Sequence, residues 1–498
     1  MSNQALDSSQ PNPVDTALDK KVVLVLFHND LRVDDNATLL KSAALASDDG
    51  RLLLVYASTF AARLADKKGS QDSKYYAFDE MGAARQQFLS ESLADLDESL
   101  QRLGNRLLCL PNLKVASESQ SEEDLQAATL PPKFLSQGRS ESALELDAFA
   151  QLCQLIEQEH ITDICVSQTA DYNQNQAYDA LQATYPFIDW HSQSVNTLFI
   201  TLPTHDLPKS FTQFRKKVEA NHDLLTAEND LFTCQTPKTL PPMPDSMTNS
   251  TANNSNYFFT HQDFSEQIQP EPNFKGGETN AISHLNDYFN SDAPSTYKTT
   301  RNALDNWTHS TKFSAWLANG SLSVKVLLNR LRHHERDVIA NDSTYWIWFE
   351  LLWREYFYWY ALVHQQKLFW FEGIAQHAPT TRLDQTRLQQ WQNGTTLYPI
   401  VNACMHQLTS TGYMSNRGRQ IVASCFIHEL GLDWRYGASY FEQHLIDYDV
   451  GSNWGNWQYL AGVGADPRGC RQFNLKKQTQ QHDPNGDFIK KWQGHKTS

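Results

Sequence analysis

The sequence predicts two units, an N-terminal α/β domain with a doubly wound parallel sheet and an all-α C-terminal domain. Residues 21–27 ("KVVLVLF") and 51–57 ("RLLLVYA") are continuous apolar runs, as expected for strands buried on both faces. Helix-like runs alternate with these strands, and a βαβ order favours a parallel sheet. From about residue 275 the apolar spacing is helical, which indicates the second unit. A chain of 498 residues is long enough for both.

Two more strands and two long helices complete the predicted α/β domain. Residues 78–104 have helical spacing and end on a glycine, and residues 146–161 form a second helix. Residues 105–111 and 162–168 are the third and fourth predicted strands. No GxGxxG motif follows the first strand, so the ordinary dinucleotide-binding fingerprint is absent.

Composition divides the chain into a leader, two domains and a linker. A stretch rich in Pro, Ser, Thr and Asn (235–256) has the composition of a linker. The first residues lack the apolar core of a signal peptide, and no apolar run approaches the roughly 20 residues that cross a bilayer. We therefore expect a cytoplasmic protein with no membrane association. The predicted parts are a disordered leader (1–20), the α/β domain (21–200), an interdomain linker (201–274) and the helical domain (275–498).

Charge and tryptophan are distributed unevenly between the two halves. The net charge is −15, but residues 281–498 carry 21 Lys and Arg against 18 Asp and Glu. The rest of the chain carries 21 against 39. The second half therefore has room for a basic groove that binds nucleic acid, although ordinary surface variation would give the same totals. Twelve of the 13 tryptophans lie after residue 300, which indicates stacking or redox work beyond core packing.

Two features bear on cofactor and metal binding. The seven cysteines are scattered without a CxxC pair, so the sequence predicts no metal site. The segment "LIDYDVGSNWGNWQY" (445–459) places Asp447 and Asp449 among apolar residues, and it contains no lysine or arginine. Buried carboxylates need a cation or a ligand, so this segment is a candidate binding site.

A series of distinctive motifs runs along the chain, at 26–39 ("LFHNDLRVDDNATL"), 207–219, 274–289, 297–304, 310–323, 341–357, 411–426 and 445–474. Taken together, they resemble the photolyase/cryptochrome family, and most closely its cryptochrome DASH branch. The resemblance covers about residues 20–492. It implies an N-terminal α/β domain joined to a helical domain that holds non-covalent FAD.

The resemblance assigns the FAD-binding residues. Asp447 and Asp449 would accept hydrogen bonds from the flavin edge and from the ribose or adenine. Arg354 is the expected cation beside the flavin ring and the expected partner of Asp447. Hydroxyl and N–H groups before the helix "FSAWLANG" suit a diphosphate, although a simple N-cap would use the same residues. The other residues implied to hold FAD are Tyr297, Ser310, Thr311, Lys312, Phe313 and Ser314.

The resemblance also implies a repair pocket. Asn453 would face flavin N5, and a neutral amide there fits an enzyme that works from fully reduced FAD. Glu350 would hydrogen-bond a cyclobutane pyrimidine dimer, and Trp353 would stack on it, with Tyr459 as a second wall. A flipped lesion needs such a pocket, because a cofactor cannot reach a base inside a stacked duplex. Asn416 and Gln420 complete the pocket, and this pair argues against repair of (6-4) products, which uses histidines there.

Three further groups of residues follow from the resemblance. Arg301, Arg417 and Arg471 match phosphate-contacting arginines, which supply a salt-dependent affinity. Trp457 and Trp434 match the first two members of an electron-transfer chain of three tryptophans. The third position holds Thr381, so we expect slow or rerouted photoreduction. The segment 169–180 ("TADYNQNQAYDA") has amides where the family places a glutamate, which argues against a methenyltetrahydrofolate antenna.

These residues lead to one principal hypothesis and two alternatives. The principal one is a monomeric, light-driven photolyase that uses FAD to split cyclobutane pyrimidine dimers, mainly in single-stranded DNA. The first alternative is a blue-light receptor or regulatory nucleic-acid-binding flavoprotein without repair activity. The second is an electron-transfer flavoprotein, which would need neither Glu350 nor the arginines.

Overall fold

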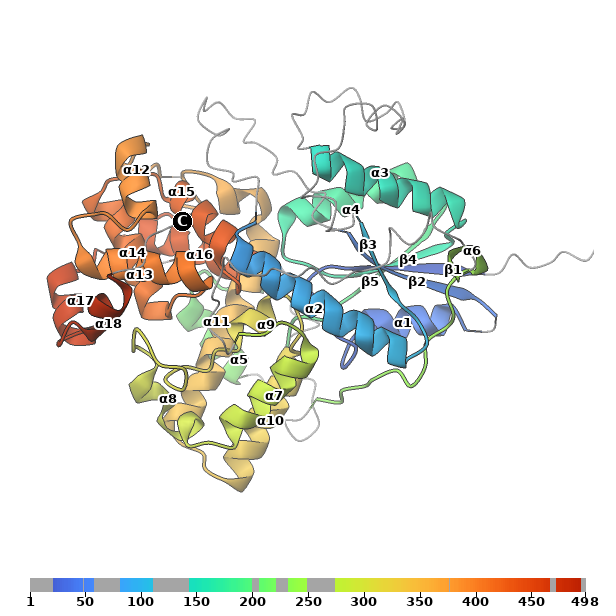
Figure 1. Cartoon of the computed structure of the whole chain (residues 1–498), viewed down its shortest axis with the longest axis horizontal. Helices are drawn as coiled ribbons and strands as arrows, with labels where there is room; N and C mark the ends of the chain where they lie inside the picture. Colours follow the sequence, from blue (N-terminus) through green and yellow to red (C-terminus); the bar gives the residue numbers. More distant parts are fainter. Residues whose placement is uncertain are drawn as a thin grey trace, which may run out of the picture.

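The structure is a computed structural model of the chain. Figure 1 shows a half built around a sheet packed against a larger helical half. The predicted leader and Arg471 lie outside the described residues. The structure describes residues 21–47, 49–57, 81–110, 143–198, 206–220, 232–248, 274–375, 377–465 and 472–493.

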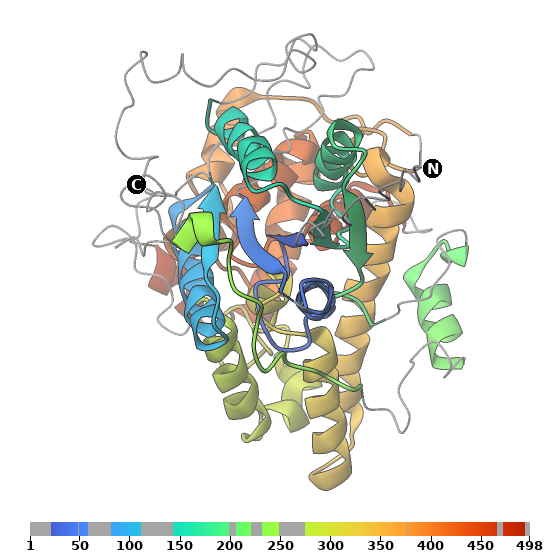
Figure 2. The ribbon, with the colours of Figure 1, turned by 90° about the vertical axis from the view of Figure 1, so that its right-hand side faces the viewer.

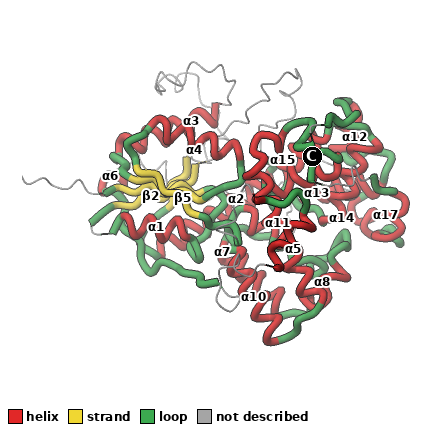
Figure 3. The backbone as a smooth tube through the Cα atoms, turned by 180° about the vertical axis from the view of Figure 1, so that it is seen from behind, coloured by secondary structure: helices red, strands yellow, loops and turns green. Residues whose placement is uncertain are grey.

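One parallel five-stranded sheet forms the framework of the N-terminal half. Its strands are Val22–Phe27 (β1), Arg51–Ala57 (β2), Leu107–Leu110 (β3), Asp163–Ser167 (β4) and Asp189–Gln193 (β5). They lie in the order β3-β2-β1-β4-β5, so the chain builds outward from β1 in both directions. Figure 3 shows the strands together in one half of the molecule and helices in the other. Val23 of β1 pairs with Leu52 of β2 on one side and with Asp163 of β4 on the other. The predicted parallel sheet is confirmed.

Helices cover both faces of this sheet (Figures 1 and 2). Val23 and Val25 of β1 pack with two of the helices, and Leu24 and Leu26 pack with the other two on the opposite face. This alternation is the period-two geometry of a strand, and it makes the domain doubly wound as predicted. The first pair is Ala37–Leu45 (α1) and Ala83–Arg102 (α2), and the second pair is Ala143–Gln158 (α3) and Tyr172–Thr184 (α4).

The fifth strand has no counterpart among the predicted elements. β5 reads "DWHSQ", and each of its side chains is at least partly exposed. It forms the edge of the sheet and pairs with β4 alone. An edge strand has little apolar surface to bury, so it lacks the continuous apolar run by which the inner strands are recognised.

The predicted linker contains two helices and an extended segment. Phe211–Ala220 (α5) buries Phe211, Phe214 and Val218, and Asp245–Thr248 (α6) is a single turn. The extended segment between these two helices runs along the α/β domain in space. There, Leu240 N donates to the carbonyl oxygen of Leu103 at 2.8 Å. The other residues of this range lie outside the described part of the chain.

The C-terminal half is helical, as predicted. Its longest helix, Asp342–His364 (α11), begins with a capping box between Asn341 and Thr344. The other helices are Glu278–Phe289 (α7), Ala293–Thr300 (α8), Ser314–Ala318 (α9), Val324–Asp337 (α10), Gln385–Gln392 (α12), Pro399–Thr411 (α13), Asn416–Ser424 (α14), Trp434–His444 (α15), Val450–Ala461 (α16), Leu475–His482 (α17) and Asp487–Trp492 (α18). A π-helical turn, Cys425–Glu429, follows α14, and a 3₁₀ turn, Gln365–Phe369, follows α11.

Buried charges join the two halves. Arg32, fully buried after β1, donates to the carbonyl oxygens of Gly320 at 2.8 Å and Val195 at 3.1 Å. Glu278 at the start of α7 accepts hydrogen bonds from the backbone N–H groups of Val33 and Asp34. The contacts with Gly320 and Glu278 hold the turn after α9 and the start of α7 against the loop that follows β1.

Two properties of the described residues concern membranes and metal ions. None of their helices is long and apolar enough to span a bilayer. No group of three or more His, Cys, Asp or Glu side chains within the same residues is placed to hold a metal ion.

Candidate functional site

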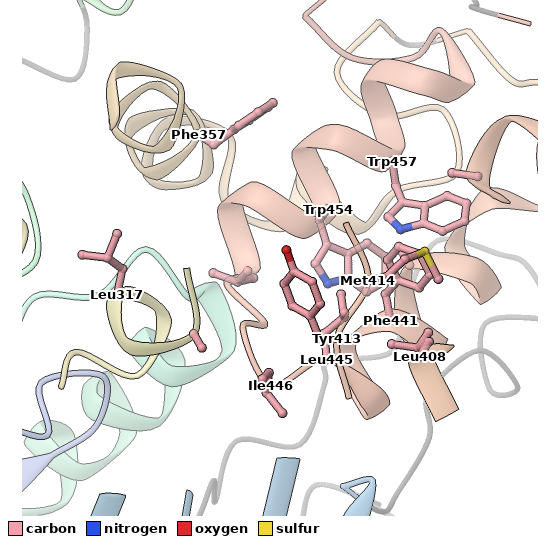
Figure 4. Close-up of a cluster of buried hydrophobic side chains, with 14 of the residues drawn as sticks. Leu317, Phe357, Leu408, Tyr413, Met414, Phe441, Leu445, Ile446, Trp454 and Trp457 are labelled. Carbon is pink, nitrogen blue, oxygen red and sulfur yellow. The ribbon is translucent and has the colours of Figure 1, made fainter. Parts of the chain in front are cut away.

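The predicted site residues lie on neighbouring helices of the C-terminal half. Figure 4 shows the apolar side chains that these helices bring together, including Leu317 from α9, Phe357 from α11 and Trp454 from α16. Tyr413, in the turn before α14, points its hydroxyl into the same region. A surface of this kind, apolar with a few polar groups, is typical of sites for planar cofactors.

The loop before α9 holds an unusual lysine. Lys312 is buried and adopts a positive φ of 57°, which is uncommon outside glycine. Its Nζ donates to Ser310 Oγ at 2.9 Å and to Tyr413 Oη at 3.2 Å. Both partners are hydroxyl groups, so the positive charge remains available to an anionic ligand. Backbone strain of this kind concentrates at functional sites.

The helix that follows this loop is shorter than the sequence indicates. α9 spans only Ser314–Ala318, and Gly320 ends it with a φ of 75°. A Cβ on Gly320 would lie 2.0 Å from the carbonyl oxygen of Asn29, so the close approach of the two domains requires glycine. Five residues give only a small dipole, so a diphosphate here would depend on Lys312 and the neighbouring hydroxyls.

The predicted pairing of Arg354 with Asp447 is wrong. Asp447 is buried, and both its oxygens accept from Arg419 Nη2, at 2.9 and 2.8 Å. Arg354 donates instead to the carbonyl oxygen of Asn196 at 2.9 Å and lies 3.5 Å from the buried Glu355. The acidic segment therefore takes its cation from α14, where Arg419 lies between Asn416 and Gln420, the two residues predicted to contact the lesion.

The start of α16 fixes the other two residues of the acidic segment. Asp449 is the N-cap and accepts from Ser452 N at 2.7 Å. Asn453 donates its amide N–H to the carbonyl oxygen of Ala438 in α15 at 2.9 Å. This hydrogen bond orients the amide, so the face that it presents to a ligand is set by the packing of two helices.

Glu350 and Trp353 lie one turn apart on α11. Glu350 Oε1 is 2.5 Å from Arg301 Nη2, at the end of α8. Burial raises the pKa of Glu350, whereas the Arg301 charge and the Trp346 N–H lower it. The Trp353 ring lies 6.3 Å from that of Tyr459, with the two planes nearly perpendicular.

Helix α5 supports Trp353 from the linker side. The Phe211 ring is parallel to the indole, with centroids 3.7 Å apart. Arg215 donates to Tyr345 Oη at 2.7 Å, and Tyr345 donates to Glu219 at 2.6 Å, which ties α5 to α11. In the sequence, α5 falls within the family-like motif at 207–219 inside the predicted linker, and its contact with Trp353 has no local signal.

Helix α14 carries three of the predicted site residues. Asn416 begins the helix and Gln420 follows one turn later on the same face. Arg417 donates to Asn302 Oδ1 at 3.0 Å. Burial and the nearby charge of Arg301 lower the pKa of Arg417, so these two guanidinium groups lie close enough to repel each other.

Each of the two tryptophans predicted to transfer electrons lies beside a different tryptophan. Trp457 lies 6.3 Å from Trp391 and Trp434 lies 5.8 Å from Trp454, measured between ring centroids. Thr381 precedes a bridge between Arg382 and Leu432, which places it beside the start of α15 and hence near Trp434.

Other residues predicted to bind FAD or the antenna lie in the core, in the loop before α9 and at the start of α4. Tyr297 and Phe313 are buried in the core of the helical half. His284 hydrogen-bonds the carbonyl oxygen of Thr311 at 2.8 Å, which fixes the loop that carries Ser310. In the segment 169–180, Asp171 caps α4 by accepting from two backbone N–H groups.

Comparison with known proteins identifies both halves. Residues 23–118 match the family model for DNA photolyase, and residues 346–495 match that for the FAD binding domain of DNA photolyase. Cryptochrome DASH of Vibrio parahaemolyticus is 44% identical over 481 residues, covering 95% of this chain and 94% of the relative. Cryptochrome DASH of Idiomarina loihiensis is 43% identical, covering 96% and 93%.

Solved structures give the same result. A Synechocystis cryptochrome has 33% sequence identity and a TM-score of 0.75, covering 95% of this chain and 88% of its own. A class III photolyase from Agrobacterium tumefaciens shares the fold, with a TM-score of 0.67 at 24% identity over 96% of this chain and 88% of its own.

Proposed function

Because the chain belongs to the cryptochrome DASH branch of the photolyase/cryptochrome family and carries its FAD-binding domain, we propose that it repairs cyclobutane pyrimidine dimers with light, preferring single-stranded DNA. The observation that carries the proposal is the group formed by Glu350, Trp353 and Tyr459. It places a carboxyl group and two aromatic rings on the adjoining helices α11 and α16.

The described residues fit FAD. Lys312, with Ser310 and Tyr413 as its partners, would hold the diphosphate. Asp447 would accept a hydrogen bond from the flavin edge, because each carboxylate oxygen can accept a second bond besides that from Arg419. The apolar side chains of Figure 4 would surround the ring. The other residues that we assign to the cofactor are Asp449, Arg354, Asn453, Tyr297, Thr311, Phe313 and Ser314.

Reduced FAD, when bound and excited by blue or near-UV light, supplies an electron to the dimer and recovers it after the ring opens. The residues of this chain hold the lesion for that step. Trp353 and Tyr459 would pack against the flipped bases, and Glu350 would hydrogen-bond a thymine edge as negative charge develops. Asn416 and Gln420 would complete the pocket from α14.

The arginines would bind the DNA backbone. Arg301 contacts Glu350, and its charge reaches Arg417 and lowers the pKa of that guanidinium, so a phosphate bound to both would relieve their repulsion. Arg471 is assigned the same role by resemblance. A single-stranded substrate fits because unpaired bases cost less free energy to move out of the stack.

Illumination of the purified protein tests the proposal. Dimer-containing single- and double-stranded oligonucleotides are exposed to blue light with FAD fully reduced, and intact dimer is measured by chromatography. We expect light-dependent loss, faster on the single strand. Glu350→Gln and Asn416→Ala should lower the yield and keep the yellow colour of bound FAD. No loss on either substrate would refute the proposal.

The second candidate function is a blue-light receptor without repair activity. One observation favours it: the carboxylate that repair requires is already paired with Arg301. A receptor would retain FAD and bind nucleic acid in the dark and in light, yet leave the dimer intact. The same illumination experiment therefore separates the two functions.

A further inference from the structure

The contact between Arg301 and Glu350 joins two residues that have separate roles in the proposed function. Arg301 would contact phosphate and Glu350 would contact the lesion, yet their side chains approach to 2.5 Å. Within the described residues, Glu350 Oε1 has no hydrogen bond of good geometry, from Arg301 or from Trp346. The pair is therefore held by charge, without the directional bonding of a locked salt bridge.

A second ion pair in the same domain shows the contrast. Arg419 makes two aligned hydrogen bonds to Asp447, whose side chain is only 2% exposed. The Glu350 side chain is 31% exposed, so part of it faces solvent, while its Oε1 atom is buried against Arg301. The Arg301–Glu350 pair therefore has weaker hydrogen-bond geometry and is more accessible than the Arg419–Asp447 pair. Both properties suit a contact that can exchange partners.

The surroundings of Arg301 offer such a partner. Its guanidinium lies 5.7 Å from the centre of the Trp346 ring, and its charge is close enough to Arg417 to lower the pKa of that residue. Arg417 Nε is buried and donates to no described group. Two cations and an unused donor in one place form a position for a phosphate. Tyr297 and Trp346 are the other polar groups that face Glu350.

We propose that Arg301 is a displaceable counterion: it neutralises Glu350 while the pocket is empty, and it moves to a backbone phosphate when a strand binds. Backbone binding and exposure of the lesion-contacting carboxyl group are then one event. This inference rests on the proposed function for the role of Glu350. Its test uses undamaged DNA, so that it can fail independently of repair.

Equilibrium binding of an undamaged single-stranded oligonucleotide provides the test. Glu350→Gln releases Arg301 for phosphate, so we expect affinity to rise about fivefold, which corresponds to about 1 kcal/mol. The slope of log affinity against log salt should steepen by about 0.7, the value for one added phosphate contact on a single strand. In an Arg301→Gln background the same change should alter affinity less than about twofold.

Two controls make the result specific. Lys298 lies over the same Trp346 ring but pairs with Asp342, so Lys298→Gln should weaken binding equally with Glu350 or with Gln at position 350. Arg301→Lys keeps the charge and should preserve most of the coupling. It also serves if Arg301→Gln, judged by thermal melting and FAD absorbance, does not fold.

Equal tightening by Glu350→Gln with and without Arg301 would mean simple charge repulsion and would overturn the inference. So would the absence of any tightening. Light-dependent dimer loss by the wild type is measured separately. Repair without the coupling would refute the counterion role alone, whereas coupling without repair would refute the photolyase proposal and leave the counterion exchange standing.

Discussion

At the scale of residues, the acidic segment changes most between sequence and structure. Asp447 lacks a cation nearby in the sequence, and the structure supplies Arg419 from a different helix. Arg354 was the residue expected there, but its own neighbour Glu355 is fully buried and needs a positive charge. The cost of an unpaired buried charge thus explains both pairings.

Arg419→Gln should therefore be among the most damaging substitutions. It leaves Asp447 buried without a counterion, which costs about 3–5 kcal/mol. We expect a lower free energy of unfolding in urea and a reduced ratio of FAD to protein after purification. The same substitution at Arg336, whose pair with Asp337 is exposed, is the control. Equal effects of the two substitutions would contradict this assignment.

His444 should make the folded state sensitive to acid. Burial lowers the pKa of its imidazole to about 4, from the ordinary value of 6.5. The unfolded chain then binds a proton at a higher pH than the folded chain does. Stability is full above pH 6.5 and falls as the pH drops toward 4, by up to about 3 kcal/mol.

His444→Gln should flatten this dependence in urea titrations between pH 7 and pH 4.5. His377 is exposed, so His377→Gln is the matched control and should leave the slope unchanged. A slope that is the same in the wild type and in His444→Gln would show that other groups cause the acid sensitivity.

At the scale of elements, prediction succeeds where the apolar pattern is strong. The inner strands and α11 bury continuous or periodic apolar faces, and both were predictable. β5 and α5 were not, because β5 is a polar edge strand and α5 owes its position to Phe211 on Trp353, a tertiary contact. Site residues came from family resemblance, whereas the partners Arg419 and Tyr413 needed the structure.

The position of Thr381 beside the start of α15 gives a prediction at this scale. Thr381→Trp would place an oxidisable ring next to Trp434 and should speed photoreduction of FAD by an external thiol. Trp434→Phe should slow it if Trp434 lies on the path. The rate is followed by the loss of oxidised-flavin absorbance under blue light. A wild type already as fast as Thr381→Trp would show that no gap exists at this position.

At the scale of the whole molecule, the two domains are joined through buried polar contacts. Arg32, from the α/β domain, donates to Gly320 beside α9, and Glu278 from α7 binds the backbone after β1. Burial raises the pKa of Glu278 to about 7. This junction therefore buries ionisable groups that each domain alone would expose to water. The loop that carries Lys312 leads into α9, and Gly320 at the far end of α9 belongs to this junction.

Arg32→Met should uncouple the domains. The substitution leaves several buried carbonyl oxygens without a donor, at a cost of about 1–3 kcal/mol for each group that stays unsatisfied. We expect two unfolding transitions in urea in place of one, and weaker FAD retention. Arg51→Met, which removes a largely exposed contact with Asp245, is the control. A single transition of unchanged midpoint would contradict this role.

The most direct test of the central claim is the amount of thymine dimer in a single-stranded oligonucleotide before and after blue light, with reduced protein present. The account predicts light-dependent loss that falls at least ~10-fold in Glu350→Gln, since the glutamine amide is a weaker hydrogen-bond donor to developing negative charge than a carboxyl group. Dimer that stays constant in light with FAD fully reduced would contradict it.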